Sequence, residues 1–187
     1  MAPYISFGTG ESVNKRVDEE YLVLKAQAGS EKAFSILFRS YNPSLLRSAF
    51  RLCRNEQMAL DAVQDAWLTI SRTLGALTKP AMFRARVFKA VRWRTIDLMR
   101  KRDNNLETLD EDVLDESAED QSWATTNQIV SMVERLPEVE RQAIYLFYLE
   151  EMSIKELAKV FDVPTGTVKS RLNRARTRLK KLVGDTE

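Results

Sequence analysis

Apolar residues recur along the chain at the spacing of helices, in segments that glycine and proline residues separate. Residues 31–41 illustrate the pattern, because most of their large apolar side chains are three or four positions apart: Phe34, Leu37, Phe38 and Tyr41. Such spacing places the side chains on one face of a helix. No segment alternates apolar and polar residues over the length of a strand. The chain is therefore predicted to be all-α.

The same periodicity predicts five helices in the first half of the chain, at residues 18–28, 31–41, 43–53, 56–74 and 81–102. Four more follow residue 127, and the last two carry start signals. Ser153 with Glu156 three positions later forms a capping box, and Thr165 is a suitable N-cap for the final helix. Only residues 162–164 separate these two helices, and so short a turn is typical of helix-turn-helix DNA-binding motifs.

Charge divides the chain into two basic blocks and an acidic spacer. Residues 103–124 contain nine acidic and no basic side chains, and since the whole chain carries +2, the remainder carries +11. This stretch has too few large apolar residues to offset the entropy of ordering and is predicted to be a flexible linker. Residues 1–17 are polar and predicted to be a flexible tail. Two small helical domains result, at 18–102 and 125–187, whose charge favours a polyanionic partner.

The composition removes several kinds of chemistry. The 187 residues include no histidine and one cysteine, Cys53, which excludes histidine acid-base catalysis, internal disulfides and the usual zinc sites. A calcium-binding loop starting at Asp103 is excluded, because Thr108 and Leu114 occupy the positions where such a loop needs glycine and glutamate. No catalytic residue, metal or cofactor is predicted, and the chain is not expected to be an enzyme. Cys53 lies among apolar residues and is interpreted as a buried small hydrophobe.

The apolar segments are also too short for a bilayer. No run of about 18 apolar residues occurs, and the N-terminus lacks the basic-then-apolar order of a secretion signal. We therefore expect a cytoplasmic protein with no direct membrane insertion.

The last predicted helix carries the most specific chemical signal. Between Val163 and Val183 there are seven basic and no acidic residues. An apolar stripe is expected to face inward: Val168, Leu172, Ala175, Leu179 and Leu182. The side chains left outside suit DNA, because arginine, lysine and asparagine pair with base edges in the major groove. A charge run alone usually means a solvated helix face, but the preceding capped helix and short turn favour DNA binding.

The predicted helix at 81–102 is also basic. From Phe83 to Arg102 there are eight basic residues and one acid, Asp97, with Phe83 and Trp93 interleaved. Basic side chains follow a phosphate backbone and aromatic rings stack on unpaired bases, so this combination favours single-stranded or melted DNA. Either ring can instead belong to the hydrophobic core. The core interpretation is favoured for Phe83, whereas for Trp93 the core and DNA-stacking interpretations are equally favoured.

One further face is acidic. Asp61, Gln64 and Asp65 lie on the same side of the helix predicted at 56–74. Such a face is ordinarily just solvated, so the pattern by itself assigns it no function.

Four stretches together resemble the extracytoplasmic-function (ECF) family of RNA polymerase sigma factors. They read DEEYLVLKAQAGSEKAFSILFRSY at 18–41, DAVQDAWLTI at 61–70, TIDLMRKR at 95–102 and SIKELAKVFDVPTGTVKSRLNRAR at 153–176. Each stretch alone is weak evidence for the family, but the four together, in this order and at this spacing, are highly specific for it. The resemblance implies a sigma-2 helical bundle at 18–102 and a sigma-4 helix-turn-helix domain at 125–187, with no sigma-3 domain between them.

The resemblance also implies a promoter contact for each basic helix. The last helix would read the −35 element, and together with the residue pattern this gives the candidates Lys155, Pro164, Thr165, Thr167, Lys169, Ser170, Arg171, Asn173, Arg174 and Arg176. The earlier basic helix and the loop before it would bind and open the −10 element, with candidates Lys79, Phe83, Arg84, Arg92, Trp93, Arg94, Arg100 and Lys101.

Protein partners follow from the same resemblance. Asp61, Gln64 and Asp65 would dock on the β′ clamp helices of core RNA polymerase, the polymerase β flap would be a second contact, and the linker would occupy the nucleic-acid channel. The expected function is to recruit core polymerase to specific promoters and help to melt the DNA. An anti-sigma factor is a further partner that the family suggests, although no residue here specifies one.

Three positions depart from the family pattern. Trp93 stands where relatives commonly have asparagine and Arg86 where they commonly have tryptophan, so no −10 base preference can be carried over. Asp162 replaces the frequent glycine of the turn, but aspartate tolerates left-handed backbone better than most residues, which leaves the motif intact.

Two alternatives compete with the sigma-factor interpretation. A stand-alone helix-turn-helix regulator would use the C-terminal block, but would leave the basic-aromatic helix and the Asp61 face without a task. A carboxylate-metal nuclease is disfavoured, because the dense carboxylates lie in the predicted flexible linker, which cannot preorganise a metal site.

Overall fold

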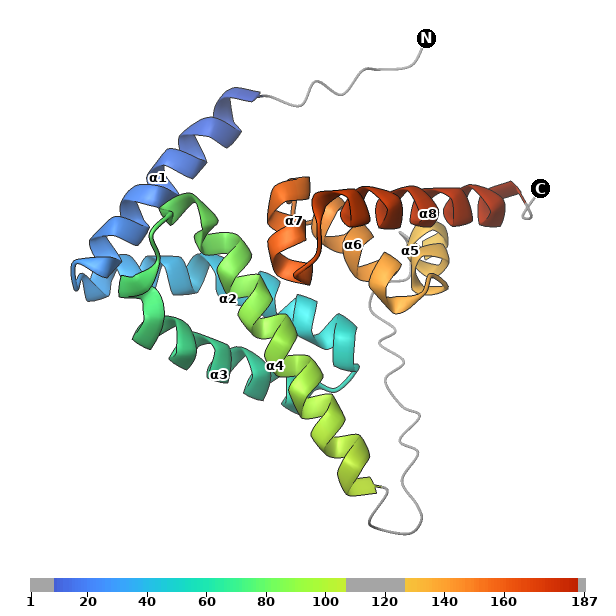
Figure 1. Cartoon of the computed structure of the whole chain (residues 1–187), viewed down its shortest axis with the longest axis horizontal. Coiled ribbons are helices and arrows are strands. Elements are labelled where there is room, and N and C mark those ends of the chain that lie inside the picture. The colour runs from blue at the N-terminus through green and yellow to red at the C-terminus, as the bar shows by residue number, and fades with distance from the viewer. Residues whose placement is uncertain (1–8, 107–126, 185–187) are drawn as a thin grey trace.

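A computed structural model describes residues 9–106 and 127–184 (Figure 1). The first range holds α1 (Thr9–Gln27), α2 (Glu31–Cys53), α3 (Glu56–Thr73), the 3-10 helices η1 (Leu74–Ala76) and η2 (Pro80–Met82), and α4 (Phe83–Leu106). The second holds α5 (Asn127–Glu134), α6 (Glu138–Tyr148), α7 (Ile154–Phe161) and α8 (Thr165–Gly184). These ranges contain no strand, which confirms the all-α prediction, and none of their helices is long and apolar enough to cross a bilayer.

Helices α1 to α4, with η1 and η2, form an N-terminal bundle. Its core is built from the apolar faces that the periodicity predicts: Val23, Leu37, Leu45, Val63, Trp67, Ile70, Phe83 and Val87. The Trp67 ring packs against Phe34 and Phe38, with ring centroids 5.7 and 5.0 Å away, and its indole N–H donates a hydrogen bond to Asn42 Oδ1 at 3.2 Å. The amphipathic helices therefore bury one common core, as expected for a small helical bundle.

Two predicted helices are in fact one. Pro43 was expected to separate helices at 31–41 and 43–53, but α2 runs unbroken through it. A proline lacks the N–H that would bond the carbonyl four residues earlier, which belongs to Arg39. The Arg39 side chain is exposed, so solvent can reach this part of the helix, while Leu37 and Leu45 anchor both halves in the core. Tertiary packing thus outweighs the local break.

Two element boundaries also differ from prediction. Helix α1 begins at Thr9, so residues 9–17, expected in the flexible tail, are helical. Helix α4 continues to Leu106, which places the first residues of the predicted linker in its last turn. The rest of the predicted linker, up to residue 124, lies outside the described residues, as do residues 1–8.

Helices α5 to α8 form a C-terminal domain with the predicted helix-turn-helix. The capping box is present, because Ser153 Oγ accepts from the Glu156 amide at 3.3 Å and the Glu156 carboxylate accepts from the Ser153 amide at 2.8 Å. Asp162 ends α7 in the left-handed conformation, with φ of 56°. Thr165 is already the first residue of α8, so it lies one position inside the expected cap.

Cys53, the last residue of α2, is half-buried, and its thiol donates to the Asn55 carbonyl at 3.3 Å. Burial raises the pKa of the Cys53 thiol.

We expect the folded chain to react with a disulfide reagent more slowly at pH 8 than the urea-unfolded chain, and this reaction to become faster only at higher pH. Because the folded thiol holds its proton more tightly, its contribution to stability is complete below the unfolded pKa and is lost as pH rises through the folded one. Equal reaction rates for folded and unfolded chains would contradict this.

Candidate nucleic-acid interface

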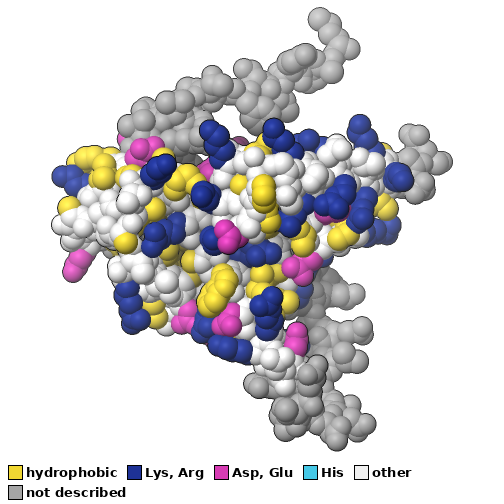
Figure 2. All heavy atoms as spheres, in the orientation of Figure 1, with side chains coloured by type: hydrophobic (Ala, Val, Ile, Leu, Met, Phe, Trp, Pro, Cys, Tyr) yellow, Lys and Arg dark blue, Asp and Glu magenta, His cyan; other side chains and the backbone are white. Residues whose placement is uncertain are grey.

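Helix α8 presents a basic face to solvent. Val168, Leu172 and Ala175 are buried against the rest of the C-terminal domain, as the predicted stripe requires. Lysine and arginine side chains consequently gather along α8 on the outer surface (Figure 2). Of the ten predicted −35 candidates, eight are exposed: Lys155, Pro164, Thr165, Lys169, Ser170, Asn173, Arg174 and Arg176. This face has the length and donor chemistry to enter a major groove.

Three of the predicted −35 arginines are also engaged within the domain. Arg176 Nε donates to the Tyr148 hydroxyl at 3.0 Å and its guanidinium lies 5.6 Å from the Phe147 ring. The Arg171 guanidinium lies 5.5 Å from the Phe161 ring, and Arg174 faces Glu140. By contrast, the Lys155, Lys169 and Asn173 side chains have no ion pair or hydrogen bond to any described residue. These three are therefore the most available for base contacts.

Glu140 on α6 is a site residue that the sequence pattern missed. It is only 6% exposed, and its carboxylate lies 3.3 Å from Arg178 Nη1 and 3.9 Å from Arg174 Nε. No described residue donates a hydrogen bond to its Oε2, so the pairing is mainly electrostatic. The sequence did contain a signal that Glu140 would be buried. Glu140 precedes Ala143 and Ile144 by three and four positions, which places it on the apolar face of α6. A buried carboxylate there holds two cations of α8 in place.

The two aromatic residues of α4 have opposite environments. Phe83 is 0% exposed and packs against Tyr41, with ring centroids 5.7 Å apart, so the ring presents no surface to DNA in this structure. Trp93 is 65% exposed and lines a groove between α3 and α4 together with Leu68, Arg86 and Lys89. The structure thus places Phe83 in the core and leaves Trp93 available for stacking on a base.

The acidic face of α3 and the basic face of α4 meet at one ion-pair cluster. Arg94 Nη2 lies 2.6 Å from Asp65 Oδ2, and Arg94 Nη1 lies 2.6 Å from Asp97 Oδ2. Lys101 Nζ lies 3.1 Å from the same Asp97 oxygen, and the hydrogen bond from Lys101 is the main reason that the pKa of the Asp97 carboxyl falls below its usual value. Asp65 and Arg94, predicted to serve different partners, are therefore coupled.

The remaining α3 and α4 candidates divide by exposure. Asp61 and Gln64 are exposed, and Asp61 accepts a hydrogen bond from Gln57 Nε2 at 3.0 Å. Lys79 and Arg100 are exposed as well. The other two −10 candidates, Arg84 and Arg92, are part-buried because both face the C-terminal domain.

Comparison with known proteins agrees with this architecture. The chain matches the family descriptions "Sigma-70 region 2" over residues 37–105 and "Sigma-70, region 4" over residues 126–179. Among solved structures, it resembles the sigma factor RpoE in complex with the anti-sigma factor NepR from Bartonella quintana, with a TM-score of 0.64 and 25% identity over 82% of this chain and 98% of that one. CnrH in complex with the cytosolic domain of CnrY shares the fold, with a TM-score of 0.64 and 23% identity over 90% of this chain and 99% of that one.

Sequence similarity extends over nearly the whole chain. The ECF RNA polymerase sigma factor SigM of Mycobacterium tuberculosis is 31% identical over 182 residues, which cover 97% of this chain and 91% of SigM. The ECF sigma factor SigW of Bacillus subtilis is 24% identical over 179 residues, covering 87% and 95%. Identity over this span, with both sigma-70 regions in order on an all-helical fold, shows that the chain belongs to the extracytoplasmic-function RNA polymerase sigma factors.

Proposed function

We propose that this sigma factor recruits core RNA polymerase to promoters by reading the −35 element with α8 and by binding and opening the −10 element with α4 and the loop before it. The observation that carries the proposal is that Lys169 and Asn173 are exposed on a helix-turn-helix and form no side-chain hydrogen bond or ion pair with a described residue, because such side chains suit base edges. Trp93, exposed beside basic side chains, supports capture of an unpaired base.

The same proposal assigns the protein partners. Asp61, Gln64 and Asp65 would hold the β′ clamp helices of core polymerase, and the C-terminal domain would contact the β flap. An anti-sigma factor is a further proposed partner, since the structurally similar sigma factor RpoE was solved in complex with the anti-sigma factor NepR. Because it would act with polymerase, the chain is proposed to work in the cytoplasm, with no catalytic chemistry and no cofactor of its own.

Mapping transcription starts provides the test. Core polymerase with and without the purified chain would transcribe a genomic DNA library in vitro, and transcript 5′ ends would be sequenced. We expect a discrete set of starts that requires the chain and shares sequence elements near −35 and −10. Starts that are identical with and without the chain would overturn the proposal, and duplex binding at full affinity without polymerase would favour a stand-alone regulator instead.

Reversing the charge of Asp61 should weaken the hold on core polymerase. Asp61 is preferable to Asp65 as a probe, because among the described residues its side chain contacts only the exposed Gln57 through a hydrogen bond and forms no ion pair. We expect Asp61→Arg to reduce affinity for core polymerase by about tenfold, since a like charge at an interface costs binding energy. Fluorescence anisotropy of a labelled chain titrated with core polymerase measures this.

Glu20→Arg on α1 is the matched control, since it makes the same charge reversal at an exposed position outside the proposed face. It should bind core polymerase like the unmodified chain. Equal affinities for the Asp61 and Glu20 variants would remove the α3 face from the proposed polymerase contact.

A further inference from the structure

The basic face of α8 is more restrained than its exposure suggests. All four arginines in the described part of α8 contact a partner within the C-terminal domain: Arg171, Arg174, Arg176 and Arg178. Arg174 and Arg178 are one helical turn apart and share one carboxylate, that of Glu140 on α6. Lys169, proposed to read bases, has no such partner among the described residues. The fold therefore restrains the arginines of α8 and leaves Lys169 free to move.

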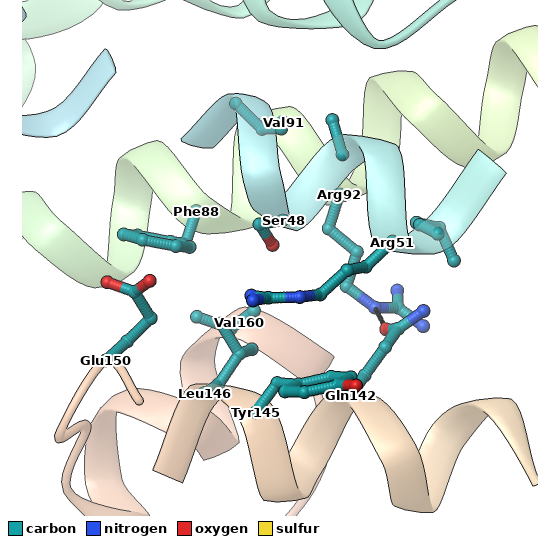
Figure 3. A pocket seen from close by; sticks show the side chains of 12 residues that line it. Ser48, Arg51, Phe88, Val91, Arg92, Gln142, Tyr145, Leu146, Glu150 and Val160 are labelled. Carbon is teal, nitrogen blue, oxygen red and sulfur yellow. Dashed lines mark hydrogen bonds between the residues drawn. The ribbon is translucent and has the colours of Figure 1, made fainter. Parts of the chain in front are cut away.

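Glu140 has little freedom to follow these arginines, because α6 is packed on two opposite faces. Glu140 faces α8, while Gln142, Tyr145 and Leu146 point the other way, toward α2 and α4 (Figure 3). Arg92 of α4 donates a hydrogen bond to Gln142 Oε1 at 3.0 Å. Glu140 is also only 6% exposed, so little solvent reaches its carboxylate. The carboxylate is therefore a fixed negative charge beside one flank of α8.

Burial of this carboxylate opposes the release of both arginines. Glu140 Oε2 accepts no hydrogen bond from a described residue and lies 3.3 Å from Arg178 Nη1, while Oε1 lies 3.9 Å from Arg174 Nε. A buried charge is tolerated when an opposite charge compensates it, so moving both guanidinium groups away would leave the carboxylate uncompensated. The arginine side chains are nevertheless 60% and 49% exposed. They can thus contact a phosphate that comes within reach, but cannot follow one that lies elsewhere.

We propose that Glu140 is a positioning residue for promoter recognition, which fixes Arg174 and Arg178 and cancels part of their charge, so that α8 gains phosphate contacts mainly where its base contacts are also made. The inference rests on the proposed function, because it concerns how α8 recognises the −35 element. Unrestrained arginines would add affinity for any duplex, since phosphate contacts carry no sequence information. At the −35 element the base contacts set the register of α8, and the fixed guanidinium groups meet phosphates without moving. Glu140 therefore raises the ratio of specific to non-specific affinity.

Two substitutions at Glu140 remove the carboxylate in different ways. Glu140→Gln keeps the size of the side chain, whereas Glu140→Leu places an apolar group on the apolar face of α6, a replacement that buried ion pairs often tolerate. Glu138→Gln is the matched control, because it makes the same change of charge on the same helix, at an exposed position whose carboxylate accepts a hydrogen bond from Gln142. Circular dichroism and urea unfolding would establish that each variant folds, and the leucine variant serves if the buried amide destabilises the domain.

Fluorescence anisotropy of the full chain without polymerase measures binding to two duplexes at several salt concentrations. One duplex carries the −35 element identified by start mapping, and the other carries the same bases in scrambled order. For both Glu140 variants we expect about five- to tenfold tighter binding to the scrambled duplex, and a slope of log affinity against log salt that is steeper by about 0.9, as for one additional phosphate contact. Affinity for the −35 duplex should change by less than about twofold, because its register already satisfies the arginines.

An unchanged salt slope in the Glu140 variants, or an equal change in the Glu138→Gln control, would overturn the role of Glu140. A merely structural role would lower stability or weaken binding to both duplexes, and would not steepen the slope. Failure of the proposed function would look different: the unmodified chain would bind the two duplexes equally, while the slope on the scrambled duplex would still respond to Glu140. The two proposals therefore fail separately.

Discussion

Alanine at both Lys169 and Asn173 is expected to lower initiation at cognate promoters on the order of 100-fold, because each side chain that pairs with a base edge contributes about 1–3 kcal/mol of discrimination. Both side chains are exposed on the outer face of α8 and have no hydrogen bond or ion pair to any described residue. Removing these side chains should therefore change the stability of the fold very little. The loss of initiation would then report the loss of DNA contacts. Promoter-specific transcript yield with core polymerase, together with anisotropy on a −35 duplex, measures the effect.

The control is alanine at Thr177 and Lys180, which removes one polar group and one cation from the same helix closer to its C-terminal end. We expect side chains there to contact phosphate at most, so that the variant changes initiation by only a few-fold. If the Lys169/Asn173 variant lost no more activity than this control, the N-terminal half of α8 would not be the base-reading element.

Phe83→Ala is expected to destabilise the N-terminal bundle by about 3–5 kcal/mol, the usual cost of truncating a fully buried aromatic side chain. Phe83 is 0% exposed and its ring packs against Tyr41 in the same core that holds Val87 and Ile70. A loss of this size is a large part of the stability of a small domain, about 5–15 kcal/mol. Urea unfolding followed by circular dichroism measures it.

Trp93→Ala on the same helix is the comparison, because Trp93 is 65% exposed. Its removal should change stability by no more than about 0.5 kcal/mol, while weakening binding to single-stranded −10 DNA by about 1–3 kcal/mol if the ring stacks on a base. The reverse outcome, a stable Phe83 variant with impaired DNA binding, would mean that Phe83 and not Trp93 faces the promoter.

Local sequence patterns were enough to predict the helices and the DNA-binding motif of this protein. Helical periodicity located the helices, and the Ser153–Glu156 capping box and the short turn at Asp162 identified the helix-turn-helix. These predictions succeeded because capping, left-handed turns and amphipathic faces depend on residues within a few positions of one another. The family resemblance could be seen for the same reason, since each motif is a contiguous stretch.

Which side chains are exposed depends instead on how the helices pack together. Phe83 and Trp93 look alike in the sequence, yet one is in the core and the other on the surface, because burial depends on how α4 rotates against α2 and α3. Pro43 predicted a break, but packing of both flanking halves of α2 keeps the helix continuous.

Glu140, which holds Arg174 and Arg178, and the pairing of Arg84 and Arg92 with the C-terminal domain join residues from separate elements. No local pattern records such contacts, since they form only when distant helices come together and charged groups must find partners as water is excluded. The chain thus specifies its helices and its DNA-binding motif residue by residue, while the packing of its two halves decides which of those residues are exposed.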